Sequence, residues 1–176
     1  MIRQQRLRVE LPVVLALGSN LGDREATLRD AVFAIDQLAG VRVDAVSSIV
    51  ETPALKLAGV DHSAPSYLNA VVRVLCEHEP RALLDALQRI EIEHGRVRDE
   101  RWGDRTLDID IVAFGQLELS QPELTIPHPR ASDRAFVLVP WLQLDPHATL
   151  PGHGRVDALL AGLHNDAAHY EAEPLW

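Results

Sequence analysis

The order of apolar patterns along the chain is the strongest constraint on its fold. Strand-like segments, each a short apolar run or an alternation of apolar residues, cover residues 13–17, 41–49, 67–76 and 106–114. Apolar residues at helical spacing follow Asp23 up to Gly40, and a second helical segment runs from Pro80 to Gly95. The predicted order is strand, helix, strand, strand, helix, strand. Split units of this kind fold as an antiparallel sheet with both helices on one face.

The rest of the chain is expected to cover the opposite face of this sheet. Residues 116–176 offer a small hairpin around 117–125 and a helix over about 132–144. Residues 53–66 form a loop long enough to favour a functional role. We expect a flexible N-terminal arm at residues 1–12, a single domain at 13–164 and a C-terminal tail at 165–176.

Composition excludes several classes of protein. The chain has 176 residues and a net charge of −9, which argues against general nucleic-acid binding. Its single cysteine excludes an internal disulfide and is typical of a reducing cytosol. No apolar stretch reaches the length of a membrane span or a signal sequence. We therefore expect a cytoplasmic protein that binds neither nucleic acid nor membrane.

Residues 95–110 combine the side chains that bind phosphate with those that bind a hard cation. Arginines at 96, 98, 101 and 105 and a tryptophan at 102 precede Asp108 and Asp110. Guanidinium groups suit phosphate oxygens, and paired carboxylates suit Mg2+. The segment predicts a site for a polyphosphate and its metal, which is the chemistry of phosphoryl or pyrophosphoryl transfer.

An Asp-x-Asp pair on an alternating strand is more often only a solvated surface. In residues 106–114 both aspartates are expected on one face with Val112 and Phe114, whereas Leu107, Ile109, Ile111 and Ala113 occupy the other. Two like charges beside apolar side chains require a metal or the arginines as compensation. The arginines at 96–105 could simply form local ion pairs with neighbouring acidic residues. Trp102 argues against this explanation, because an exposed tryptophan could stack on a heteroaromatic ring.

Other motifs are weaker. Residues 18–22 lie between a strand and a helix but lack the lysine and spacing of a P-loop. The eight histidines show no zinc-binding spacing. His128, held between two prolines, is more often structural than catalytic in such a setting.

Taken together, these segments resemble the 6-hydroxymethyl-7,8-dihydropterin pyrophosphokinase family. The similar pieces, in the family's order, are residues 17–21, 52–53, 67–70, 88–91, 95–98, 101–103, 105–110, 125–128 and 134–136. The resemblance implies an α+β fold with a ferredoxin-like βαββαβ core in an α/β/α sandwich, the C-terminal segment lying over the open face. It also implies a monomer whose partners are ATP and a reduced pterin.

The resemblance assigns a role to each site residue. Catalysis would depend on Arg96, Arg105, Asp108 and Asp110, and the two aspartates would hold two Mg2+ ions. ATP would lie beside Gln88, Glu91, Arg98, Arg101, Trp102, Ile111, Thr125, His128 and Arg134. The pterin would lie against Gly18, Thr52, Pro53, Leu55, Tyr67, Asn69, Trp102 and Phe136.

The expected reaction is transfer of diphosphate from ATP to the pterin hydroxymethyl group, with release of AMP, in tetrahydrofolate biosynthesis. Two alternatives stay open from the residues alone. A binding module of the same fold would turn nothing over, and a kinase that moves one phosphoryl group would release ADP.

Overall fold

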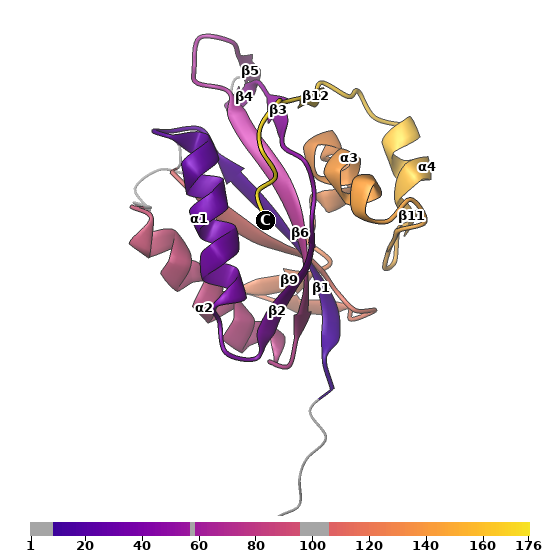
Figure 1. The fold of residues 1–176 in the computed structure, drawn as a ribbon. Helices are drawn as coiled ribbons and strands as arrows, with labels where there is room; N and C mark the ends of the chain where they lie inside the picture. The colour runs from indigo at the N-terminus through magenta and orange to yellow at the C-terminus, as the bar shows by residue number, and fades with distance from the viewer. Residues whose placement is uncertain (1–8, 57–58, 96–105) are drawn as a thin grey trace, which may run out of the picture.

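The structure is a computed structural model of the chain, and it describes residues 9–56, 59–95 and 106–176. Its first half contains β1 (Leu11–Ser19), α1 (Arg24–Asp36), β2 (Val41–Val46), β3 (Val50–Thr52), β6 (Tyr67–Cys76), α2 (Pro80–Glu93) and β7 (Asp108–Phe114) (Figure 1). The predicted alternation of strands and helices is therefore confirmed. β1 begins at Leu11, inside the stretch expected to be an arm.

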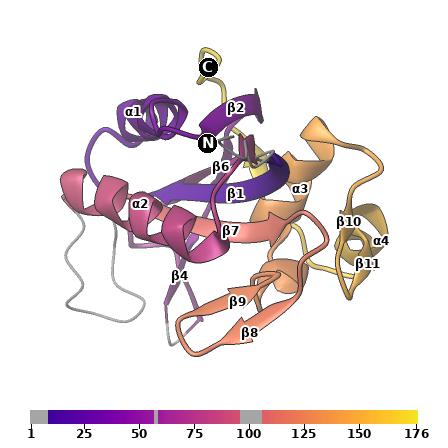
Figure 2. The same cartoon turned by 90° about the horizontal axis from the view of Figure 1, so that it is seen from below.

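One antiparallel sheet organises the molecule. Its strand order is β12-β3-β6-β1-β7, and β2 also pairs with β6. Every pairing in this sheet is antiparallel. Figure 2 shows α1 and α2 on one face of the sheet and α3 (Ala135–Leu144) on the other, as predicted. The fold is mixed α and β, with helices on both faces of the sheet.

The core between the sheet and the first two helices follows from the sequence periodicity. Asp23 caps α1, because its side chain accepts a 3.1 Å hydrogen bond from the backbone N–H of Ala26. The buried residues of both helices recur at helical spacing: Leu28, Val32, Ile35, Leu83, Leu87 and Ile90. Alternate residues of β6, from Leu68 to Cys76, complete this core.

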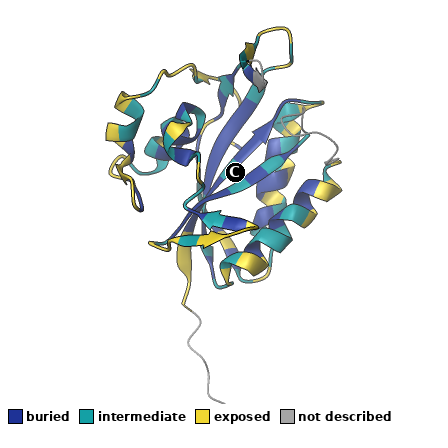
Figure 3. Ribbon diagram, turned by 180° about the vertical axis from the view of Figure 1, so that it is seen from behind, coloured by how far each residue is buried: buried dark blue, intermediate teal, exposed yellow. Residues whose placement is uncertain are grey.

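A second core lies beneath the later helices. Val71 of β6 points into it and packs with Leu138 and Trp141 of α3. The remaining elements are a hairpin of β8 (Leu119–Gln121) and β9 (Leu124–Ile126), a 3-10 turn (Ala131–Asp133), β10 (Thr149–Leu150), β11 (Gly154–Arg155), α4 (Val156–Ala161) and β12 (Ala168–His169). The predicted hairpin and helix are confirmed, although the helix begins at Ala135 rather than near 132. In Figure 3 the central strands are mostly buried, whereas the helices carry exposed residues.

Strand β7 corrects the predicted division of its faces. The register with β1 shifts by one residue, because Val14 pairs with Ala113 whereas Leu15 pairs with Ile111. Val112 is therefore a β-bulge, which reverses the alternation beyond it. Ala113 packs in the second core and Phe114 in the first, the reverse of the prediction.

Two more predicted segments differ from the structure. The strand expected over 41–49 ends at Val46, after a register shift at Asp44, and β3 begins at Val50. The expected loop at 53–66 contains a hairpin of β4 (Ala54–Lys56) and β5 (Gly59–Asp61). Gly59, the first residue of β5, has a φ of +112°, a value that L-residues rarely adopt.

Candidate active site

A cavity of about 500 Å³ opens on the side of the sheet away from α1 and α2. Its floor is the end of β1, and its walls come from the β4–β5 hairpin, the turn before α3 and the chain after α4. Lining residues are Ala16, Leu17, Gly18, Thr52, Pro53, Val60, Tyr67, Asp108, Asp110, His128, Pro129, Arg130, Asp133, Arg134, Ala135, Phe136, His164 and Asp166. The aspartate pair therefore shares one cavity with most of the residues assigned to the pterin.

Asp110 is the centre of the charged end of this cavity. Its Oδ2 accepts a 3.1 Å hydrogen bond from Nη1 of Arg134, and Nε2 of His128 lies 3.5 Å from the same oxygen. The β7 bulge places His128 there, because the carbonyl of Val112 accepts a 2.9 Å hydrogen bond from the His128 backbone N–H. The bulge in β7 thus helps to bring His128 close to the carboxylate of Asp110, although the two residues are distant in sequence.

The pKa of Asp110 is raised above its ordinary value. Burial is the main cause, and the charge of Asp108 two residues away adds to it. His128 and Arg134 act in the opposite direction but do not compensate fully. Among the described residues, His128 and Arg134 thus offset only part of the effect of burial and of Asp108 on this carboxyl.

His128 is held in a defined orientation. Its Nδ1 accepts a 3.1 Å hydrogen bond from the backbone N–H of Arg130, so a neutral ring carries its proton on Nε2, the atom nearest Asp110. Burial lowers the pKa of His128, with Asp110 opposing and Arg134 reinforcing this effect. A neutral imidazole can donate one hydrogen bond from Nε2 into the cavity.

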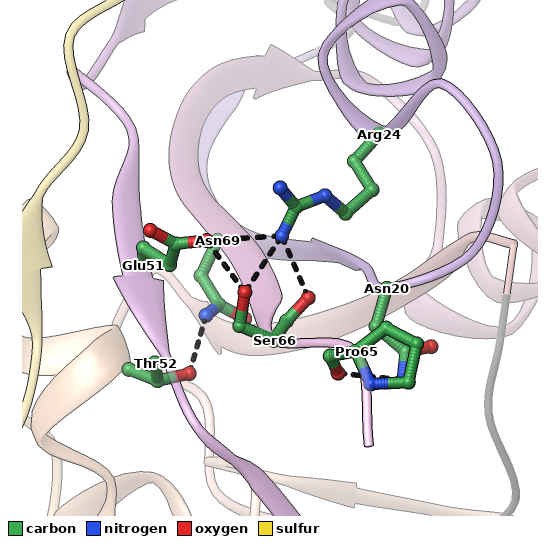
Figure 4. Close-up of polar contacts among 7 residues, drawn as sticks. All are labelled: Asn20, Arg24, Glu51, Thr52, Pro65, Ser66 and Asn69. Carbon is green, nitrogen blue, oxygen red and sulfur yellow. Dashed lines mark hydrogen bonds and ion pairs between the residues drawn. The ribbon is translucent and has the colours of Figure 1, made fainter. Parts of the chain in front are cut away.

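The other end of the cavity is apolar with a few polar groups. Nδ2 of Asn69 donates a 3.0 Å hydrogen bond to Oγ1 of Thr52, joining β6 to β3 (Figure 4). Gly18 keeps the floor open, because a Cβ on it would lie 3.1 Å from Oδ1 of Asn69. The Tyr67 and Phe136 rings also line the cavity, and the Arg134 guanidinium lies 5.6 Å from the Phe136 centroid. A flat heteroaromatic ring suits such walls.

A polar cluster holds the base of the β4–β5 hairpin beside this end (Figure 4). Nη1 of Arg24 lies 2.8 Å from both Ser66 oxygens and 3.1 Å from Oε1 of Glu51. The Ser66 hydroxyl donates a 2.5 Å hydrogen bond to the same glutamate oxygen, which lowers the pKa of Glu51. Glu51 precedes Thr52 and Ser66 precedes Tyr67, so the cluster fixes both ends of the hairpin segment.

Several residues assigned by resemblance do not line this cavity. Glu91 is 2% exposed, and its Oε1 accepts a 2.7 Å hydrogen bond from the Ile109 backbone N–H. Ile111 is buried in the core beneath α1 and α2. Gln88 and Thr125 are half-buried on α2 and β9, and Asn69 is buried with its amide bonded to Thr52. Arg96, Arg98, Arg101, Trp102, Arg105 and the Leu55 side chain lie outside the described residues.

The structure also adds residues that the sequence did not reveal. Arg130 and Asp133 line the cavity from the turn before α3, where the His128-Pro129 motif was the available signal. His164 and Asp166 line it from the chain after α4, and no motif marks them.

The donor set fits Mg2+ in part. Asp108 and Asp110 alternate on β7 and both line the cavity, and burial together with the Asp108 charge raises the pKa of Asp110. Within the described residues no cluster of three or more ligating side chains occurs. Mg2+ commonly takes one or two carboxylates and completes its shell with water and substrate phosphates, so two aspartates suffice.

Comparison with known proteins gives the same family as the sequence motifs. The family model described as 7,8-dihydro-6-hydroxymethylpterin-pyrophosphokinase matches residues 14–146. A relative from Pseudomonas aeruginosa, named 2-amino-4-hydroxy-6-hydroxymethyldihydropteridine pyrophosphokinase, is 42% identical over 85% of this chain and 90% of its own. Relatives of the same name from Bacillus subtilis and Mycobacterium leprae are each 44% identical, over 74% and 85% of this chain and 75% and 81% of theirs.

Solved structures agree in fold. Plasmodium falciparum HPPK-DHPS A437G with pteroate has a TM-score of 0.65 at 14% identity, over 89% of this chain. This chain spans 43% of that one, less than half of its length. Within the described residues, no helix has the length and apolar character needed to cross a membrane. On the match of its sequence over residues 14–146 and its identity to these relatives, the chain belongs to the 7,8-dihydro-6-hydroxymethylpterin-pyrophosphokinase family.

Proposed function

We propose that this chain transfers diphosphate from ATP to the hydroxymethyl group of 6-hydroxymethyl-7,8-dihydropterin, releasing AMP, as a step of tetrahydrofolate biosynthesis. The observation that carries the proposal is one cavity with two different ends, in a chain that belongs to this family. One end of that cavity gathers Asp108, Asp110, His128 and Arg134, and the other gathers Thr52, Tyr67 and Phe136. The end with the two carboxylates suits Mg2+ and the triphosphate of ATP, and the apolar end suits a flat ring such as a pterin.

Each end has its own task in the transfer. The aromatic side chains of Tyr67 and Phe136 hold the pterin ring, with Gly18 beneath it, so that the hydroxymethyl oxygen lies toward Asp110. That oxygen attacks the β-phosphorus in line, and AMP leaves. Arg134 and the Nε2–H of His128 stabilise charge on the transferred phosphates. In this proposal Asp110 is also the acceptor for the proton of the attacking hydroxyl.

Asp108 and Asp110 are the proposed ligands of two Mg2+ ions that enter with ATP. When bound, Mg2+ neutralises phosphate charge and acidifies the attacking hydroxyl. The proposal also includes Arg96, Arg98, Arg101 and Arg105 as phosphate ligands and Trp102 as a stacking residue. Gln88, Glu91, Ile111 and Thr125 are included around the nucleotide, and Leu55 and Asn69 around the pterin.

The core is proposed to be ferredoxin-like. The sheet order β3-β6-β1-β7 supports this, with β2 and β3 together taking the place of one edge strand. The chain supplies both ends of the cavity by itself, which supports a monomeric enzyme. A single buried cysteine supports a cytoplasmic location.

The decisive experiment identifies the nucleotide product. The protein is incubated with ATP, Mg2+ and 6-hydroxymethyl-7,8-dihydropterin, and nucleotides are separated by chromatography. We expect AMP in equal amount to pterin diphosphate. ADP would indicate transfer of one phosphoryl group, and unchanged ATP with a bound pterin would indicate a binding module. Asp110→Asn is the matched variant, because it keeps the shape of the side chain and removes its charge.

A further inference from the structure

The chain after α4 is a segment that its sequence marks simply as a tail. We name residues 164–176 the C-terminal strap. The match to the family model ends at residue 146, so the strap lies outside it. The strap nevertheless crosses the sheet beside β3, the strand that ends at the cavity in Thr52 (Figure 1). Its importance for the cavity depends on what holds the strap and on what the strap holds in turn.

Backbone pairing joins the strap to β3. Strand β12 pairs with β3 in antiparallel fashion, and Ala168 lies opposite Glu51. The Tyr170 backbone N–H donates a 3.1 Å hydrogen bond to the carbonyl of Ile49. Hydrogen-bonded pairs alternate along an antiparallel ladder, so Ala168 and Glu51, two residues away, form the next such pair. The backbone N–H of Glu51 therefore faces the strap.

Strand β3 needs this second neighbour because it is short. It has three residues, Val50–Thr52, and its other side pairs with β6. Two of the three carry contacts that shape the cavity end. Oε1 of Glu51 accepts a hydrogen bond from the Ser66 hydroxyl, and Oγ1 of Thr52 accepts one from Asn69. A three-residue strand with one neighbour has few backbone hydrogen bonds and opens easily, so the strap restrains the backbone that presents these side chains.

Packing anchors the far end of the strap. Leu175 is 6% exposed and belongs to the core beneath α1 and α2. Arg29 of α1 donates hydrogen bonds to the carbonyls of Glu173 and Pro174. The same helix carries Arg24, which holds the base of the β4–β5 hairpin (Figure 4). The strap is thus fixed to the domain at both of its ends, by β3 and by α1.

We propose that the C-terminal strap positions β3, and with it Thr52 at the cavity wall, and that Leu175 is the positioning residue that anchors the strap. Leu175 contacts no substrate and acts through β3. The inference rests on the proposed function, because its effect is measured on pterin binding. Linkage adds a strict requirement: strap docking and pterin binding must strengthen each other by the same factor.

The first test compares Leu175→Ala with Leu83→Ala. Both variants remove a leucine side chain from the same core. Leu83 lies on α2, which follows the end of β6, whereas Thr52 pairs with Tyr67 at the start of β6. Dissociation constants for 6-hydroxymethyl-7,8-dihydropterin are measured by calorimetry with Mg2+ and a non-hydrolysable ATP analogue. We expect Leu175→Ala to weaken pterin binding about tenfold, which corresponds to about one hydrogen bond. Leu83→Ala should bind like wild type, and neither variant should change kcat at saturating substrates or the KM for ATP.

Two further variants separate positioning from a loss of folding. Leu175→Met keeps the size of the side chain and should recover most of the pterin affinity. Arg29→Ala leaves the core intact and removes the contacts to the strap carbonyls, so it should weaken pterin binding about threefold. The inference is overturned if Leu83→Ala weakens binding as much as Leu175→Ala. It is equally overturned if Leu175→Ala and Arg29→Ala both bind the pterin like wild type.

Amide hydrogen exchange reads the docking of the strap directly. The backbone N–H groups of Glu51 and Tyr170 should exchange about tenfold faster in Leu175→Ala than in wild type, and unchanged in Leu83→Ala. In wild type, the pterin with Mg2+ and the ATP analogue should slow exchange at Tyr170 by the same factor by which Leu175→Ala weakens binding. Exchange at Tyr170 that the pterin leaves unchanged would show that strap and site are not coupled.

These outcomes are separable from failure of the proposed function. If wild type forms AMP and Leu175→Ala has the same pterin affinity as Leu83→Ala, the role of the strap alone fails. If wild type forms no AMP, the proposed function fails, and the calorimetric and exchange comparisons still decide whether the strap is coupled to pterin binding.

Discussion

The Oε1 atom of Glu91 accepts a 2.7 Å hydrogen bond from the backbone N–H of Ile109, the residue between the two cavity aspartates. β7 ends the strand order of the sheet, so a buried carboxylate from α2 supplies an acceptor at its outer edge. Glu91 therefore holds the part of β7 that carries Asp108 and Asp110. It does so from the side of the sheet that α2 covers, and it does not line the cavity itself.

Replacing Glu91 should affect both stability and the proposed metal site. Glu91→Ala leaves the Ile109 N–H buried without its acceptor, so the free energy of unfolding should fall by about 1–3 kcal/mol. The Mg2+ concentration for half-maximal activity should rise, because Asp108 and Asp110 lose a shared support. Glu91→Gln keeps an acceptor and should recover most of the stability. Urea unfolding and Mg2+ titration of turnover measure the two effects, and an alanine variant with wild-type values would exclude this role.

Asp110→Asn should make the metal-free protein more stable at neutral pH. The pKa of Asp110 is raised in the folded state from its ordinary value of 3.8. Above pH 3.8 the folded protein therefore binds more protons here than the unfolded chain, and stability falls as pH rises until the folded-state pKa is passed. Asparagine does not ionise, so the variant does not lose stability in this way as pH rises. Urea unfolding in EDTA from pH 4 to 8 should show a variant advantage that grows with pH and then levels off.

The same substitution should abolish the benefit of the metal. Mg2+ should stabilise wild type more as pH rises, since binding requires the ionised carboxylate. Asp110→Asn should gain little from Mg2+ and lose about a thousandfold in turnover, which corresponds to several kcal/mol of electrostatic stabilisation. A variant that Mg2+ stabilises as well as wild type would place the metal elsewhere.

Arg24→Ala should weaken pterin binding without affecting ATP. The arginine holds Ser66 and Glu51, which flank Tyr67 and Thr52 (Figure 4). A partly exposed ion pair contributes about 1 kcal/mol or less, so the KM for the pterin should rise about fivefold. Arg24→Lys should recover part of the effect. Steady-state kinetics with each substrate varied separates this result from a general loss of folding, which would lower kcat for both.

Acid should weaken the same cluster. The pKa of Glu51 is lowered from its ordinary value of 4.5, so its contribution to stability is present above that pH and is lost as pH falls through the folded-state pKa. The stability difference between wild type and Glu51→Gln should therefore shrink in acid, as measured by urea unfolding at pH 3 and 7. If the stability difference between wild type and Glu51→Gln is the same at pH 3 and pH 7, protonation of Glu51 does not cause the loss of stability in acid.

Gly18→Ala tests the close approach at the cavity floor. The new methyl group would lie 3.1 Å from Oδ1 of Asn69 and 3.7 Å from Cδ1 of Tyr67, so the amide must shift. We expect the KM for the pterin to rise about tenfold, through loss of about one hydrogen bond's worth of binding. Gly162→Ala is the control, since its methyl group would lie 3.6 Å from the nearest atom and outside the cavity. Equal kinetics in the two variants would contradict a tight floor.

Local patterns predicted the elements whose periodicity is unbroken. The alternation from Tyr67 to Cys76 predicted β6 at both ends, because a central strand needs apolar side chains on both faces. Pro80 and Gly95 bounded α2, since proline fits a first turn and Gly95 has a φ of +80°. The sequence also singled out Asp108 and Asp110, which the structure places in one cavity, because charged residues on an otherwise apolar strand are conspicuous.

Tertiary structure decided what local patterns could not. The bulge at Val112 reverses the faces of β7 and presents the carbonyl that orients His128, and periodicity alone assumes an unbroken ladder. Asp166 reaches the cavity through pairing between β12 and β3, which are over a hundred residues apart in the chain. Such long-range pairing depends on packing between distant segments, so no local pattern encodes it. The sequence by itself determined the elements and the placement of two carboxylates on β7, whereas the tertiary structure decided which residues line the cavity around them.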